Sequence, residues 1–230
     1  MIHFEVAGSG PAILMTHGFT GSSADFAKLV GPLARSHTVI TWDLRGHGKS
    51  DSPADPAAYS IELSLRDMAA LLDRAGAGRA VLVGHSLGGY LSLAFHLAHP
   101  ERVSTLALIG TGPGYRKDEA RAGWNEMVET RAHSLEKQGP DSIGLVHAAR
   151  GILAQRDGTV IESLPSIRVP TLIAVGENDK PFLAGSRYMA EKIPNAKLEI
   201  IAGAGHSPQE THADEVLRGI DRITRREAHR

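Results

Sequence analysis

A serine lies between glycines where a predicted buried strand gives way to a predicted helix. The stretch Gly84–Gly89 reads GHSLGG and follows the apolar run Ala80–Val83. It fits the pattern G-x-S-x-G, in which a sharp strand-to-helix turn lifts a serine hydroxyl above a sheet. Side chains flanking such a turn would collide with the neighbouring strand and helix, which accounts for the glycines. Ser86 is therefore a candidate nucleophile, although an ordinary glycine-rich helix start gives the same short pattern.

A serine hydroxyl becomes a good nucleophile only beside a base and a group that orients that base. His206 lies on the glycine-rich loop GAGHSP after the last predicted strand, and Asp179 follows another strand in the segment GENDKPF. Glu177 is the alternative acid, and each of these residues alone is equally well explained as a solvated loop residue. The order Ser86, Asp179, His206, each directly after a predicted strand, predicts a catalytic triad at one edge of the sheet.

Acyl transfer by a serine also requires hydrogen-bond donors for the negative oxygen that develops during attack. The backbone N–H of Leu87 lies at the predicted start of a helix, where negative charge is favoured. A second donor is expected from the loop after an early strand, and the sequence HGFTG follows the run Ala12–Thr16. We expect the backbone N–H groups of Phe19 and Leu87 to form this oxyanion hole.

These residues must be positioned by elements that the apolar pattern predicts. Short apolar runs alternate with helical patterns, which indicates a mostly parallel sheet with helices on both faces, an α/β fold. The predicted strands are Ala12–Thr16, Thr38–Thr41, Ala80–Val83, Val103–Ile109, Thr171–Val175 and Lys197–Ile201, with His3–Val6 as a possible antiparallel edge strand. A surface helix is expected from Ser60, as its N-cap, to Ala75, with Gly76 ending it.

The segment from about 112 to 165 interrupts the alternation, because it contains no clear strand. It predicts two helices instead, the second at Ile143–Leu153. Ligands of open α/β sheets bind beyond the carboxyl ends of the strands, so we expect this insertion to cover the site as a cap, with simple extension of the core as the alternative. We expect residues 1–230 to form a single domain carrying this cap. One face of the first cap helix is predicted to contain Trp124, Met127, Val128, Arg131 and Leu135.

Composition limits the partners. The chain has 25 basic and 26 acidic residues and no cysteine, so it carries no electrostatic footprint for nucleic acid or an anionic membrane and no thiolate nucleophile or metal ligand. No apolar run approaches the roughly 20 residues that span a bilayer, and the first residues do not resemble a secretory signal. We expect a cytoplasmic protein with a small-molecule ester substrate, no cofactor and no metal; the oligomeric state is not readable. The arginine-rich end, 221–230, is expected to fray.

Several segments together resemble the serine α/β-hydrolase superfamily, in its esterase- and lipase-like branch with a short cap, over nearly the whole chain. They are HGFTG (17–21), DLRGHGKS (43–50), GHSLGG (84–89), HPERV (99–103), GENDKPF (176–182) and GAGH (203–206). The resemblance implies Ser86 as nucleophile, His206 as base, Asp179 as its partner, and Phe19 and Leu87 as oxyanion donors. It also implies that residues 43–50 form a structural turn.

The resulting functional expectation is a carboxylesterase-like hydrolase that works through an acyl-enzyme. Haloalkane dehalogenases and epoxide hydrolases of similar sequence use an aspartate where this chain has Ser86. Two alternatives stay open. The HGFTG segment and the turn at 111–114 are similar to the menaquinone-pathway lyases that eliminate pyruvate, but those enzymes usually carry arginine where this chain has Tyr90. The other alternative is a non-catalytic module that binds a small molecule on the same fold.

Overall fold

A seven-stranded sheet forms the centre of the computed structural model, which describes residues 1–224. Its strand order is β1-β3-β2-β4-β5-β6-β7, and in the described chain only β1 runs antiparallel to its neighbour. This confirms the predicted fold class, a mostly parallel α/β sheet of the α/β-hydrolase type. The strands are β1 (Phe4–Ala7), β2 (Ala12–Thr16), β3 (Thr38–Trp42), β4 (Ala80–His85), β5 (Val103–Ile109), β6 (Thr171–Gly176) and β7 (Ala196–Ile201).

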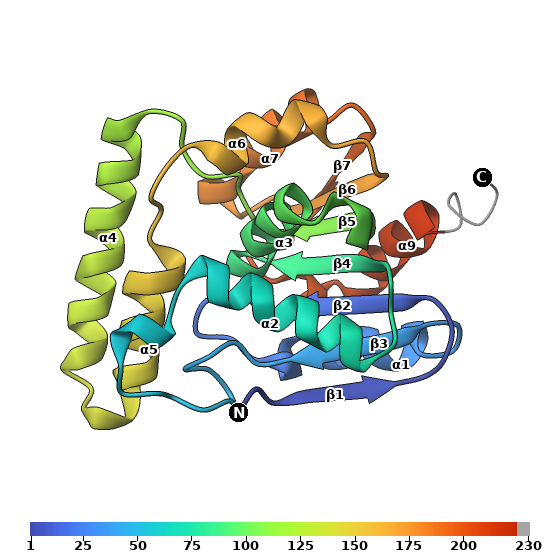
Figure 1. Cartoon of the computed structure of the whole chain (residues 1–230). Helices are drawn as coiled ribbons and strands as arrows, with labels where there is room; N and C mark the ends of the chain where they lie inside the picture. Colours follow the sequence, from blue (N-terminus) through green and yellow to red (C-terminus); the bar gives the residue numbers. More distant parts are fainter. Residues whose placement is uncertain (225–230) are drawn as a thin grey trace.

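Helices cover both faces of the sheet, as Figure 1 shows. The first face is covered by α2 (Ile61–Arg74), α3 (Leu87–Ala98) and α7 (Lys180–Lys192), and the opposite face by α1 (Ala27–Leu33) and α9 (Ala213–Thr224). A short helix, α8 (Pro208–Thr211), precedes α9. Two-sided cover explains why the central strands are continuous apolar runs rather than alternating ones.

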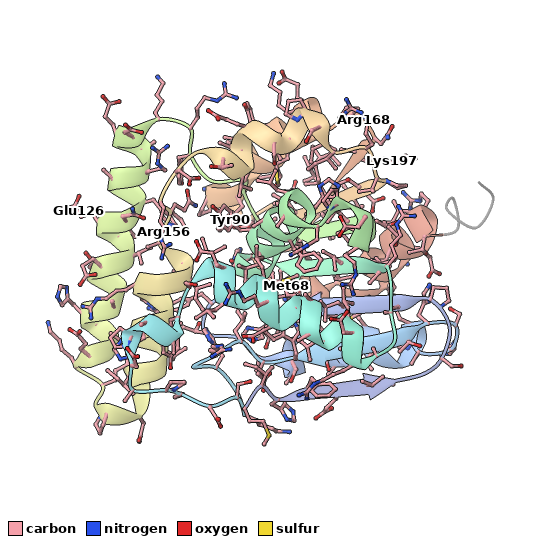
Figure 2. All side chains as sticks on the ribbon, viewed as in Figure 1. Met68, Tyr90, Glu126, Arg156, Arg168 and Lys197 are labelled. Atoms are coloured by element: carbon pink, nitrogen blue, oxygen red, sulfur yellow. The ribbon has the colours of Figure 1, made fainter. Side chains whose placement is uncertain are left out.

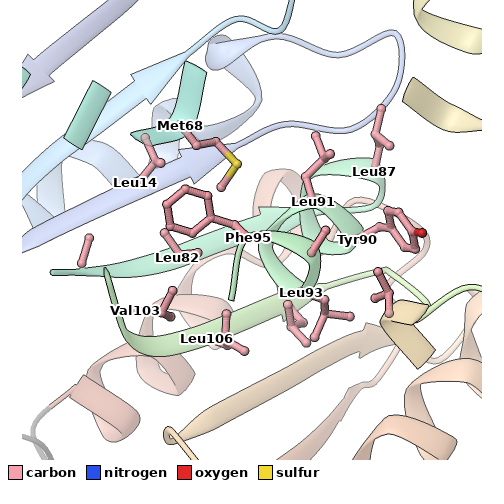
Figure 3. Packing of buried hydrophobic residues seen from close by; sticks show 14 of the residues in the cluster. Leu14, Met68, Leu82, Leu87, Tyr90, Leu91, Leu93, Phe95, Val103 and Leu106 are labelled. Atoms are coloured by element: carbon pink, nitrogen blue, oxygen red, sulfur yellow. The ribbon is translucent and has the colours of Figure 1, made fainter. Parts of the chain in front are cut away.

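Successive strand residues pack into different cores because side chains of a strand alternate between the faces. Leu14 on β2 joins the cluster that contains Met68 of α2 and Phe95 of α3 (Figure 3), whereas its neighbours Ile13 and Met15 join the cluster on the opposite face. The same alternation repeats along β4 and β5. The sheet is thereby packed between two separate apolar layers. These layers hold in place the strand ends from which the loops with the candidate site residues begin.

The predicted surface helix is confirmed as α2. The hydroxyl of Ser60 accepts a hydrogen bond from the backbone N–H of Leu63 at 3.1 Å, as expected of an N-cap. The helix ends at Arg74, and Gly76 follows with a φ of 66°, a left-handed conformation that suits glycine. The predicted edge strand is β1, and it pairs antiparallel with β3.

Between β5 and β6 the chain forms a helical insertion beside the carboxyl ends of the parallel strands (Figure 1). It has a small apolar cluster of its own, built on Val128, Ala132 and Leu135. The predicted face of its first helix is therefore partly wrong: Met127 is 53% exposed and Arg131 is exposed, because the stripe that meets the neighbouring helix is rotated. The elements are α4 (Asp118–Glu136), η4 (Pro140–Ser142), α5 (Ile143–Ala148), the π-helical turn η5 (Ala149–Leu153), α6 (Thr159–Ser163) and η6 (Leu164–Ser166).

The last described helix continues further than predicted. We expected residues 221–230 to fray, but α9 extends to Thr224, because Ile220 and Ile223 are buried against the sheet. Residues 225–230 lie outside the described residues. Within residues 1–224, no helix combines the length and the hydrophobicity that crossing a bilayer requires.

Candidate active site

Ser86 occupies a strained turn between β4 and α3. Its φ is 51° and its ψ is −114°, a backbone conformation that is rarely adopted by a residue with a side chain. A Cβ atom at Gly84 would lie 2.3 Å from the carbonyl oxygen of Gly88, and one at Gly88 would lie 1.9 Å from that of Thr16. The collisions that the glycine pattern predicted are therefore real. Only glycine at these two positions lets the strand and the helix approach so closely, with the serine at the tip of the turn.

The base and the acid meet on neighbouring loops. The Nδ1 atom of His206 lies 2.9 Å from Oδ2 of Asp179, and the Asp179 side chain is 3% exposed against 42% for His206. The alternative acid is engaged elsewhere, since Oε2 of Glu177 accepts a hydrogen bond from the backbone N–H of Gly203 at 2.9 Å. Of the two acids that the sequence left open, the geometry brings only Asp179 to the imidazole.

The serine turn and the His206 loop are joined by a direct hydrogen bond. The Nε2 atom of His85, the residue before the serine, lies 3.0 Å from the carbonyl oxygen of His206. A carbonyl can only accept, so Nε2 of His85 carries the proton. Burial lowers the pKa of His85 to about 4, which keeps its imidazole neutral. The ring of Phe182 stacks on His206 with centroids 4.8 Å apart.

Ser86 itself is not hydrogen-bonded to the base in the part of the chain that the structure describes. Contacts of this kind are often long in an empty site and tighten when substrate binds. The hydroxyl group is carried by the turn that His85 ties to His206, and the backbone N–H of Ser86 donates to the carbonyl of Ile109 at 2.9 Å. The nucleophile, base and acid candidates therefore lie at one rim of the sheet.

The two expected oxyanion donors belong to segments next to the serine. Leu87 is the first residue of α3. A Cβ atom at Gly18 would lie 3.1 Å from Cβ of Ser86, so the loop that carries Phe19 runs directly beside the nucleophile. His17 braces this loop: its Nδ1 donates to the carbonyl of Gly18 at 2.7 Å, and its Nε2 accepts from the backbone N–H of Leu44 at 3.0 Å.

The segment 43–50 ties two loops together, as the resemblance implied. The carboxylate of Asp43 accepts hydrogen bonds from the backbone N–H groups of Ser23 at 2.6 Å and Lys49 at 2.8 Å. The hydroxyl of Ser50 donates to the backbone carbonyl of Asp43 at 2.6 Å. These bonds use both carboxylate oxygens within the framework, so Asp43 holds the loops beside the site rather than facing a substrate.

A cavity of about 630 Å³ opens beside Ser86, between α3, the insertion and the start of α7. Figure 2 shows Tyr90 on the inner side of the insertion and Glu126 on the outward side of α4. Trp124 and Met127, which the sequence placed on one face of the first cap helix, both line this cavity, as does Phe182 at the start of α7. Sequence reasoning missed Gln155, because only the folding of the insertion brings that residue to the cavity. The lining includes Ser86, Tyr90, Trp124, Leu153, Gln155 and Phe182.

Comparison with known proteins agrees with this geometry. Residues 11–141 match the model of a family described as the alpha/beta hydrolase fold. A protein of Bacillus subtilis (strain 168), provisionally named a 2-succinyl-6-hydroxy-2,4-cyclohexadiene-1-carboxylate synthase, is 28% identical over 245 residues, which cover 90% of this chain and 89% of the relative. Both the motifs and the length of the match extend beyond the region of the family model.

Solved structures share the architecture over nearly the entire chain. The structure of MenH from S. aureus has a TM-score of 0.90 at 23% identity and covers 98% of this chain and 99% of its own. The structure of a thermophilic esterase from Thermogutta terrifontis has a TM-score of 0.80 at 25% identity and covers 98% and 93%. The family match, the shared architecture and the serine turn lead to one conclusion: this chain belongs to the alpha/beta hydrolase superfamily.

Proposed function

We propose that this protein is a serine hydrolase that cleaves a small carboxylic ester through an acyl-enzyme intermediate. The observation that carries the proposal is the pairing of His206 with the buried carboxylate of Asp179 at 2.9 Å, on a loop tied to the turn that presents Ser86. A hydroxyl, an imidazole and a buried carboxylate in this relation form the arrangement that generates a serine nucleophile at neutral pH.

In the first step His206 takes the proton of the Ser86 hydroxyl as its oxygen attacks the ester carbonyl. The negative oxygen that forms is stabilised by the backbone N–H groups of Phe19 and Leu87. One such donor contributes about 2.7 to 4 kcal/mol in related chemistry. His206 then gives the proton to the departing alcohol, and Ser86 is left as an acyl ester.

In the second step water, deprotonated by the same imidazole, attacks the acyl ester and releases the acid. Asp179 stays ionised throughout and holds the proton of His206 on Nδ1, so that Nε2 faces Ser86. Its 3% exposure supports this role, because a buried carboxylate interacts strongly with the imidazolium that forms during each step.

A second candidate is a lyase that eliminates pyruvate from a cyclohexadiene carboxylate precursor. It is favoured by the name of the Bacillus subtilis relative and by the 0.90 TM-score with MenH. Tyr90 argues against it, since the menaquinone-pathway lyases usually carry an arginine at this position to hold a substrate carboxylate. We therefore rank the lyase second.

The test is to assay the purified protein with a short p-nitrophenyl ester and, separately, for pyruvate release from the lyase precursor. The proposal predicts ester turnover that disappears in Ser86→Ala, and no pyruvate. Pyruvate without ester turnover would establish the lyase. If neither product forms while a small ligand raises the melting temperature, the protein is a binding module and the proposal fails.

A further inference from the structure

The cavity beside Ser86 is lined mainly by apolar side chains. Trp124 and Met127 from α4, Leu153 from the π-helical turn and Phe182 from α7 contribute to its wall. Its volume of about 630 Å³ is in the range of small-molecule sites. Among the described residues that line it, none is Lys, Arg, His, Asp or Glu. A charged group entering this cavity would therefore find no ionic partner in its wall.

Two arginines near the cavity in sequence, Arg121 and Arg156, are paired with other groups. The guanidinium of Arg121 donates to the carbonyl oxygens of Tyr115 at 3.0 Å and Arg116 at 2.7 Å, and it also pairs with Asp118. Arg156 pairs with Glu62 at 3.1 Å on the surface. Arg121 and Asp157 also act electrostatically on Tyr90, with opposite signs. A substrate carboxylate would therefore have to compete with Asp118 and Asp157 for Arg121.

The hydroxyl of Tyr90 is a polar group of the wall that makes no hydrogen bond in the described part of the chain. The ring of Tyr90 is 8% exposed and packs at the edge of the core cluster, with its hydroxyl pointing away from Phe95 (Figure 3). Within residues 1–224 this hydroxyl makes no hydrogen bond, although Tyr90 lines the cavity. Burial raises the pKa of Tyr90 to about 12, so the hydroxyl is a neutral donor at any ordinary working pH.

Gln155 of the insertion lies beside Tyr90 and is held there by a backbone hydrogen bond. A Cβ atom at Gly114 would lie 2.8 Å from Oε1 of Gln155 and 3.2 Å from Cε2 of Tyr90, so the carboxamide and the ring flank the same glycine. Oε1 of Gln155 accepts from the backbone N–H of Tyr115 at 3.1 Å. No hydrogen bond joins this oxygen to the Tyr90 hydroxyl in the described part of the chain, so the phenol proton is available to a ligand.

We propose that the cavity is the acyl pocket and that it selects an uncharged, mainly apolar acyl group carrying one oxygen acceptor, such as a keto group, which accepts a hydrogen bond from Tyr90. In this role Tyr90 is a specificity-determining residue. The assignment rests on the proposed function, since it takes Ser86 as the acceptor of the acyl group. A dicarboxylate fits poorly, because burying an unpaired carboxylate beside Trp124 and Leu153 is costly.

The test compares three ethyl esters of matched length: ethyl pentanoate, ethyl 4-oxopentanoate and monoethyl succinate. They differ in having no polar group, a neutral carbonyl or a carboxylate near the end of the acyl chain. We expect kcat/KM for the 4-oxo ester to exceed that for the pentanoate by about two- to twelvefold, as a single neutral hydrogen bond allows. Monoethyl succinate should fall at least about 100-fold below the 4-oxo ester.

Two variants assign the preference to its residue. Tyr90→Phe keeps the ring and removes the hydroxyl, so the ratio between the 4-oxo ester and the pentanoate should fall to about one. Tyr59→Phe is the matched control: Tyr59 is also buried, but its hydroxyl donates to the carbonyl of Pro53 at 3.0 Å and does not line the cavity. This control should keep the wild-type ratio.

Binding to Ser86→Ala separates the pocket from the chemistry. The same esters, titrated into this variant and followed by NMR, should bind in the same order, and the preference should vanish in the Ser86→Ala, Tyr90→Phe double variant. Turnover without the preference, or efficient turnover of monoethyl succinate, would overturn the pocket assignment and leave the hydrolase intact. Binding in the expected order without any turnover would sustain the pocket and refute the hydrolase.

Discussion

Replacing Asp179 by asparagine should reduce kcat/KM for ester hydrolysis by about 10⁴-fold. Oδ2 of Asp179 lies 2.9 Å from Nδ1 of His206 and accepts its proton, which leaves Nε2 free to take the proton of Ser86. An asparagine can turn its NH₂ group toward Nδ1 instead. The imidazole would then carry its proton on Nε2, where it blocks proton transfer from the serine.

The size of this loss follows from two contributions. A 10⁴-fold loss corresponds to about 5.5 kcal/mol in the barrier. The attraction between a carboxylate and an imidazolium about 4 Å apart amounts to about 4 kcal/mol at an effective dielectric constant of about 20. That dielectric suits a pair in which Asp179 is buried and His206 is 42% exposed. The change of tautomer supplies the remainder.

The assay is the steady-state hydrolysis of a p-nitrophenyl ester, with Glu177→Gln as the matched control. Glu177 follows the same strand, but its carboxylate accepts from Gly203, and a glutamine oxygen can keep that bond. The control should stay within about tenfold of wild type. The reasoning is refuted if Asp179→Asn keeps more than a tenth of the activity, or if Glu177→Gln loses as much as Asp179→Asn does.

Three further predictions concern stability, measured as the free energy of unfolding in urea. Gly88→Ala should lower the free energy of unfolding by about 3 kcal/mol or more, the upper end for overpacking. The reason is that the added Cβ would lie 1.9 Å from the carbonyl oxygen of Thr16. A loss below about 1 kcal/mol would contradict the tight turn. Gly123→Ala should stabilise by about 0.5 to 1 kcal/mol, because Gly123 lies inside α4 and a Cβ there meets no atom within 4 Å; destabilisation would contradict this. Burial lowers the pKa of His17, His47 and His85 most strongly below the ordinary 6.5, so the unfolded chain binds protons that the folded chain does not. The stability present above pH 6.5 should therefore fall toward pH 4, by up to about 1.4 kcal/mol per pH unit for each of these groups; equal stabilities at pH 7.5 and 5 would refute this. Their pKa values are about 3 for His17 and about 4 for His47 and His85.

The sheet and the serine turn were readable from sequence because local chemistry dictates them. The run Ala80–Val83 is apolar at every position, as a strand covered on both faces must be, and the glycines around Ser86 mark where backbones touch. Strand ends moved by only one or two residues. Since the carboxyl ends of parallel strands share one edge, chain order alone predicted which loops would meet.

The insertion was less predictable, because its buried stripe is set by a partner helix rather than by its own pattern. Met127 looks like a core residue in the sequence, yet it is 53% exposed while it lines the cavity. The π-helical turn at 149–153 has no composition signal, although the chain beyond it carries Gln155 to Tyr90.

Long-range contacts explain the remaining gap at the site. Nothing in the sequence around His85 indicates that its Nε2 donates to the carbonyl of His206, 121 residues further along the chain. The choice between Asp179 and Glu177 was likewise open in the sequence. Both follow the same strand, and only the path of the glycine-rich loop decides which carboxylate meets the imidazole and which meets Gly203.

The proposed hydrolase activity depends most directly on the reactivity of Ser86. Treating the protein with a fluorophosphonate and mapping the modified peptide by mass spectrometry measures that reactivity without any assumption about substrate. We predict a single adduct on Ser86, absent in Ser86→Ala and formed far more slowly in His206→Ala. A protein that stays unlabelled, or is labelled at another residue while Ser86 is untouched, would contradict the catalytic role of this turn.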